Sequence, residues 1–171
     1  HAPAFDGIER LFSQTRDLRG TLARAGVEAL TEVELFEVKR FLLQLVELKA
    51  AFAQVAPRFE GITFTDLPDA LALLDPGGHR AAGFSIDGAY SEALATARAE
   101  KRKLEAQRRQ QPEGPERDAL LYARRTAVAE EERETLRVRR ALSQALAAHV
   151  PAMLANIEWI GELDLILQKG K

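Results

Sequence analysis

Residues 31–55 read TEVELFEVKRFLLQLVELKAAFAQV. Thr31 and Glu34 form a capping box, in which each side chain accepts a hydrogen bond from the other residue's backbone N–H, so a helix is predicted from Glu32 to about Val55. Apolar residues cover most of its circumference, and the polar ones share one narrow stripe. Such a helix must be surrounded by neighbours, and we expect it to be the core of the domain. The stripe consists of Glu37, Arg40, Gln44, Glu47 and Gln54.

Apolar helices are also predicted near both ends of the sequence. Asp6 can cap a helix that begins near Ile8, and Gly26 ends it. Residues 152–169 form a second strongly apolar segment with helical spacing. Gly161 lies inside that segment, where its missing side chain allows another helix to approach closely. Both helices are therefore expected to belong to the same helical body as the core helix.

Turn signals separate the core helix from the charged half of the chain. Pro68 suits the first turn of a short helix, and residues 74–78 (LDPGG) predict a turn. Residues 84–88 (FSIDG) alternate like a scrap of strand and then turn through Asp-Gly. The expected fold class is all-α: a helical core bundle with a two-helix hairpin and at most a tiny strand near 84–86.

Two long helices follow, with a break between them at residues 111–115 (QPEGP). The first begins at its N-cap Ser91, runs to about Gln110 and loses its apolar face on the way. The second is predicted from Glu116 to about His149. Its apolar residues recur every seven positions, a spacing suited to packing on one partner helix. They are Leu121, Val128, Thr135 and Leu142.

A short connection between two long helices favours an antiparallel hairpin. We expect a lever-like hairpin over residues 91–149, with its tip near 111–116. A helical core body is expected from residues 1–90 and 150–171, so that both chain ends lie in the body and the hairpin projects from it as an arm. His1-Ala2-Pro3 does not resemble a natural start, and the chain is interpreted as a fragment of a larger protein.

Length and composition exclude several classes of protein. The 171 residues are within the size of one domain, and 46% hydrophobic with 29% charged residues exclude both a disordered chain and a membrane protein. The sequence has no cysteine, which excludes disulfides and thiolate metal sites. These features fit a cytoplasmic protein.

No pattern typical of catalysis is found. His1, His79 and His149 lack the spacing of metal ligands, so a metal site is not expected. Asp75 precedes Pro and Asp87 precedes Gly, which indicates turns rather than a catalytic pair. The sequence has no phosphate-binding GxxxxGK[ST] loop. We expect that this chain is not an enzyme and that it holds no cofactor itself.

Positive charge is concentrated between residues 98 and 140, which carry thirteen Lys/Arg against nine Asp/Glu, whereas the rest carries eleven against seventeen. Phosphate contacts need only cations along an accessible surface, so this region is the candidate for binding nucleic acid. The competing interpretation is a solvated hairpin whose Glu residues form local ion pairs worth little each. The acidic run 130–132 would repel DNA, so contacts are expected nearer the tip. The candidate residues are Lys101, Arg102, Lys103, Arg108, Arg109, Arg117, Arg124 and Arg125.

Several segments, in this order and spacing, are similar to those of a known family: Glu34–Leu42 (ELFEVKRFL), Leu73–Gly77 (LLDPG), Phe84–Gly88 (FSIDG), Tyr90–Leu94 (YSEAL) leading to Arg98, Ile157–Leu165 (IEWIGELDL) and Gln168–Gly170 (QKG). Together they resemble the core and lever region of the MutS family of DNA mismatch-repair ATPases. The resemblance covers most of the chain from about Thr31 onward.

In that family the core supports two long lever helices, which carry a DNA-gripping clamp and communicate with the nucleotide site. This sequence has neither the mismatch-reading domain nor the ATPase, and residues 111–115 stand where a clamp domain would be inserted. It therefore looks more like the second, mismatch-independent subfamily or another divergent relative.

The resemblance implies the core and lever module of a DNA-binding ATPase, acting in DNA repair or recombination control. The module would support contact with the DNA backbone and transmit nucleotide-driven motion. Its partners would be DNA, the ATPase domain of the same parent chain, which would hold ATP and Mg²⁺, and, in a homodimer, a second copy of the protein. The alternative is a structural or dimerisation module that pairs as a coiled coil without binding DNA.

Overall fold

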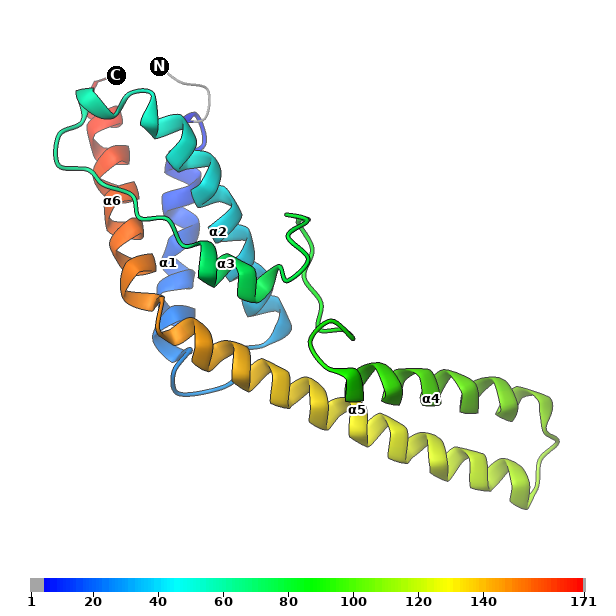
Figure 1. Ribbon diagram of the computed structural model, residues 1–171. Coiled ribbons are helices and arrows are strands. Elements are labelled where there is room, and N and C mark those ends of the chain that lie inside the picture. The colour runs from blue at the N-terminus through cyan, green and yellow to red at the C-terminus, as the bar shows by residue number, and fades with distance from the viewer. Residues whose placement is uncertain (1–4, 171) are drawn as a thin grey trace. The chain divides into compact units, whose positions relative to one another are not determined.

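The computed structural model describes residues 5–170 and confirms the all-α prediction (Figure 1). These residues contain no strand, and the stretch 84–86 is irregular backbone. The expectations for His1 and for the start of the chain lie outside the described residues. The helices are α1 (Ile8–Arg24), α2 (Glu32–Ala53), α3 (Pro68–Leu74), α4 (Glu92–Gln110), α5 (Pro115–Ala147) and α6 (Val150–Lys169), with one turn of 3-10 helix at Ala56–Arg58.

The chain divides into two compact units. Residues up to 84 and from 142 onward form the first unit, and residues 85–141 form the second, which we call the hairpin unit. The first unit contains α1, α2, α3, α6 and the last turns of α5. The hairpin unit contains α4 and most of α5.

Helix α2 buries apolar side chains along most of its length. The capping box is confirmed: the backbone N–H of Glu34 donates to the Thr31 hydroxyl over 3.1 Å, and that of Thr31 donates to the Glu34 carboxylate over 3.0 Å. Each of its buried apolar side chains stabilises the fold by roughly 1.5–3 kcal/mol. The helix packs on α1 and α3. Its buried apolar residues are Leu35, Val38, Phe41, Leu42, Leu45, Leu48 and Phe52.

Helices α1 and α6 lie side by side in Figure 1 and pack closely. A Cβ atom on Gly161 would lie 2.7 Å from the Phe12 ring, which confirms that this glycine allows a close approach. The prediction that Asp6 caps α1 is wrong. Gly7 occupies the N-cap position instead, where its carbonyl accepts from the N–H of Leu11 over 2.9 Å.

Two buried polar side chains connect distant segments of the first unit. Asn156 on α6 is fully buried, and its side-chain amide accepts from the N–H of Thr65 over 2.8 Å and donates to the carbonyl of Thr65 over 3.0 Å. The buried Ser143 hydroxyl accepts from the N–H of Leu30 over 2.9 Å. Because buried backbone groups need partners, these bonds fix the loops that lead into α2 and α3.

Helices α4 and α5 run antiparallel within the hairpin unit (Figure 1). The Ser91 hydroxyl accepts from the N–H of Leu94 over 3.0 Å, as expected for an N-cap. Of the predicted seven-residue seam on α5, Leu142 is buried and Leu121, Val128 and Thr135 are half-buried. The buried residues of the hairpin include Leu94, Ala97 and Leu104 on α4 and Ala127 and Val138 on α5.

Candidate nucleic-acid interface

Polar bridges between α4 and α5 fix the register of the hairpin. Ser91 donates to Glu134 over 2.8 Å, Lys101 lies 3.1 Å from Glu131, and Arg124 lies 2.8 Å from Glu105. As the residue number rises along α4, the number of its partner on α5 falls, as an antiparallel pair requires. Lys101 and Glu105 are four positions apart, and Arg124, Glu131 and Glu134 are seven and three positions apart, so on each helix they share one face.

Arginines gather at the tip-proximal end of this face. Glu105, Arg108, Arg109 and Arg124 line a surface pocket of about 350 Å³. Arg124 binds Glu105 through two nitrogens, at 2.9 and 2.8 Å. The hydrogen bond from Arg124 lowers the pKa of Glu105, so this carboxylate stays ionised at neutral pH. Three guanidinium groups therefore face one carboxylate, and the cluster keeps an excess of positive charge.

Arg108 and Arg109 are the free cations of this cluster. Both lie in the last turn of α4, where the helix dipole favours positive charge. Neither forms an ion pair with any residue in the range 5–170. Arg109 is exposed and Arg108 half-buried, so both can reach a ligand in solvent.

The other candidate residues divide into two groups. Lys101 is held by Glu131, and Arg117 lies 3.7 Å from Glu113, a carboxylate that is 93% exposed. Arg102, Lys103 and Arg125 are exposed and form no ion pair within the described part of the chain. These three residues, like Arg108 and Arg109, remain available to an external anion. Five of the eight candidates are therefore available.

The acidic run 130–132 is less repulsive than its sequence indicates. Glu131 contacts both Lys101 and Arg98, at 3.1 and 3.7 Å, and Glu130 pairs with Arg133. Only Glu132 is exposed and has no ion pair among residues 5–170. Sequence reasoning missed the pairs of Glu131, because its partners lie on α4 and become apparent only when the hairpin register is known.

The aspartates and histidines that the sequence offers for catalysis or metal binding have structural positions. Asp87 accepts from the N–H of Ala89 over 2.9 Å, and the N–H of Gly78 donates to the Asp75 carbonyl over 2.9 Å, so both predicted turns are confirmed. His79 is exposed, and His149 occupies the N-cap position of α6. Across residues 5–170 no group of His, Asp and Glu is arranged to hold a metal ion.

Comparison of the chain with family models, curated proteins and solved structures gives no match. None of the helices formed by residues 5–170 has the length and apolar character needed to cross a membrane.

Proposed function

We propose that the chain is the core and lever module of a MutS-like DNA-binding ATPase and that the hairpin contacts the DNA backbone near its tip. One observation supports the contact above all: Arg108, Arg109 and Arg124 surround a pocket that contains a single carboxylate. The bidentate geometry of guanidinium groups matches phosphate oxygens. The resemblance of segments such as 34–42 and 157–165 supports the parent family.

The proposed contact is independent of base sequence. The five available side chains are all Arg or Lys, which contact phosphates without reading base sequence. If three to five phosphates are contacted, the logarithm of the binding constant falls with the logarithm of salt concentration with a slope of roughly −2.7 to −4.5. Binding would therefore weaken roughly 40- to 500-fold between 50 and 200 mM salt.

We propose that ATP and Mg²⁺ are bound outside this chain, whose sequence has no glycine-rich loop followed by Lys and Ser or Thr. Under the proposal, nucleotide chemistry belongs to another domain of the parent protein, and this module responds to it mechanically.

A charge-matched pair of variants tests the DNA contact. Anisotropy of a fluorescent 25-base-pair duplex, titrated with the chain at 50 mM salt, should give at least tenfold weaker binding for Arg108→Gln/Arg109→Gln. The salt slope should fall by about 1.8, because two phosphate contacts are lost. Arg10→Gln/Arg16→Gln removes two exposed charges from α1 and should change binding less than twofold. Equal losses in both variants, or none in either, would refute the proposed interface.

A dimerisation module without DNA binding is the second candidate. It is favoured by Tyr122, which is 73% exposed beside an open groove between α4 and α5 lined by residues such as Ala93, Thr96 and Thr126. Analytical ultracentrifugation separates the two functions. A stable dimer with no affinity for the duplex would replace our first proposal, whereas a monomer at high concentration that binds DNA excludes the second candidate.

A further inference from the structure

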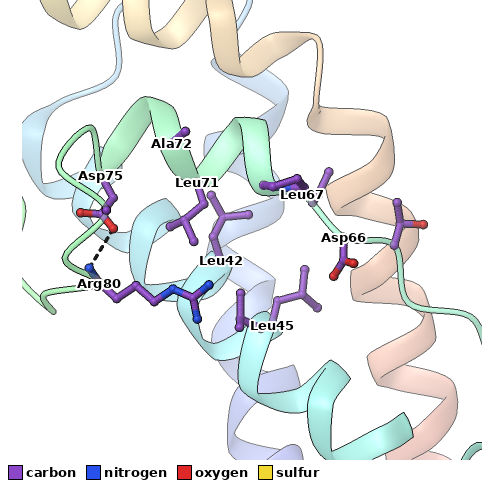
Figure 2. Close-up of a pocket in the computed structure, with 12 residues that line it drawn as sticks. Leu42, Leu45, Asp66, Leu67, Leu71, Ala72, Asp75 and Arg80 are labelled. Atoms are coloured by element: carbon purple, nitrogen blue, oxygen red, sulfur yellow. Dashed lines mark hydrogen bonds between the residues drawn. The ribbon is translucent and has the colours of Figure 1, made fainter.

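A pocket of about 440 Å³ lies in the first unit between α2, α3 and the turn after α3 (Figure 2). Leu42 and Leu45 of α2 and Leu71 of α3 are almost fully buried and form its apolar floor. Leu67 and Ala72 line it further. The volume falls in the range of small-molecule sites, which combine an apolar lining with a few fixed polar groups.

One end of the pocket is built around a buried carboxylate. Asp75 is 8% exposed, and its Oδ2 accepts a hydrogen bond from the backbone N–H of Arg80 over 2.8 Å. Its Oδ1 lies 4.0 Å from the ammonium group of Lys39, which is 4% exposed and donates to the carbonyl of Gly83 over 2.7 Å. The negative charge of Asp75 is therefore compensated within the protein.

The hydrogen bond to Asp75 holds the backbone of Arg80 in an unusual conformation. Its φ of 54° places it in the left-handed region, and it is the only non-glycine residue with positive φ among residues 5–170. Such a conformation costs energy in a side-chain-bearing residue and persists only where surrounding contacts determine it. In Figure 2 the Arg80 side chain extends from the bond with Asp75 along the pocket toward Leu45.

The Arg80 guanidinium is the uncompensated charge of the pocket. Within the described part of the chain it forms no ion pair. Asp66, the other carboxylate of the lining, lies 2.7 Å from the ammonium group of Lys49. Both carboxylates thus have cationic neighbours, and the pocket carries one free positive charge beside an apolar floor.

We infer that this pocket binds an apolar carboxylate, a compact aromatic or aliphatic body that carries one negative group. The apolar body would cover Leu42, Leu45 and Leu71, and the carboxylate would accept two parallel hydrogen bonds from Arg80. A neutral ligand would not form these charge-assisted hydrogen bonds, and a cationic one would be repelled by the guanidinium. This inference does not depend on the proposed contact with DNA.

1-Naphthoate is a suitable probe, with 1-naphthalenemethanol as its neutral analogue. At about 0.3 kcal/mol per non-hydrogen atom, a ligand of this size should bind with a Kd of about 1 mM. Titration of the ¹⁵N-labelled chain, followed by amide chemical shifts, should perturb residues 42–46 and 65–80. The alcohol should bind at least tenfold more weakly than the acid, because it cannot form the bidentate pair.

Variants test whether naphthoate binds in this pocket. Arg80→Gln should weaken naphthoate binding at least tenfold and leave binding of the alcohol unchanged, whereas Arg58→Gln, an exposed arginine outside the pocket, should change neither. Ala72→Phe should fill the pocket and prevent binding of both ligands. Equal affinity of acid and alcohol, an unaffected Arg80→Gln variant, or no shift changes at 10 mM naphthoate would overturn the inference.

A second probe identifies the source of the carboxylate. The blocked dipeptide Ac-Leu-Asp-NH₂ offers the same chemistry from a polypeptide. Tighter binding of the dipeptide than of naphthoate would assign the pocket to an acidic, apolar protein segment, and the reverse order would assign it to a free acid. Both results require the same dependence on Arg80, so each supports the inferred ligand chemistry.

Discussion

Single polar side chains carry much of the specificity of the first unit. Asn156 uses both ends of its side-chain amide on the backbone of Thr65, and Lys39 connects α2 to the carbonyl of Gly83. Both side chains are buried, where a polar group without a partner is costly. An apolar core would hold the helices together, but these bonds determine which loop lies on which helix.

The cost of losing such a bond can be measured at Asn156. Asn156→Leu keeps an apolar side chain of similar size but leaves the N–H and the carbonyl of Thr65 without their partner. We expect the free energy of unfolding to fall by about 1–3 kcal/mol, measured by urea denaturation. Gln144→Leu, at an exposed site on α5, should change it by less than about 0.5 kcal/mol. An Asn156→Leu variant as stable as the parent would mean that water satisfies Thr65 equally well.

At the scale of helices, the capping box, Pro68 and Ser91 show which features are predictable from sequence. Each is a local signal: the bonds of the capping box and of Ser91 span three positions, and Pro68 acts through its own fixed φ. The helix boundaries that depend on them are accordingly close to the observed ones. Lys39 gave no such signal, because its partners Asp75 and Gly83 lie on other segments.

In the candidate site, too, local features are predictable from sequence and contacts between separate segments are not. Clustering of arginine near residues 108–125 is visible in the sequence, and five of the eight candidate residues are available to a ligand. That Lys101 and Arg124 are occupied by Glu131 and Glu105 depends on the hairpin register, which composition does not determine. Arg80 was missed because its role depends on backbone conformation and on a pocket made by separate helices.

The hairpin should lose stability in acid, because two of its carboxylates have lowered pKa values in the folded state. Hydrogen bonds from Arg124 and from Ser91 and Arg137 lower the pKa values of Glu105 and Glu134, respectively. A lowered pKa in the folded state stabilises the fold above the unfolded pKa of about 4.3, and this contribution is lost as pH falls through the folded value. Thermal unfolding between pH 6 and 3 should therefore show a declining Tm.

Two variants separate this effect from general acid unfolding. Glu105→Gln should flatten the decline, since one of the responsible groups no longer titrates, and Arg124→Gln should return the pKa of Glu105 toward its ordinary range, as measured by carboxyl NMR. Glu132→Gln, at an exposed carboxylate without an ion pair in the described residues, should leave the pH profile unchanged. A Glu105→Gln profile that matches the parent would exclude this bridge as a source of pH dependence.

At the scale of the whole molecule, burial is distributed unevenly between the two units. Helices α2 and α6 each bury apolar side chains along most of their length, from Leu35 to Phe52 and from Met153 to Leu163. On α4 the last buried side chain is Leu104, and the six residues that follow are exposed or half-buried. The candidate DNA-binding residues Arg108 and Arg109 thus lie on the least supported turns of the hairpin.

Hydrogen exchange should reveal this gradient. Amides in α2 between residues 38 and 48 should exchange only when the first unit unfolds, because the buried face of this helix packs on α1 and α3. Amides of residues 106–118 should exchange at least a hundredfold faster, since a helix end without tertiary packing frays readily in water. Adding a DNA duplex at low salt should slow exchange at residues 106–118 selectively, because phosphate contacts would hold Arg108 and Arg109 in place. Uniform protection along α4, or slowing by DNA that is strongest in α2, would contradict a mobile contact surface at the hairpin tip.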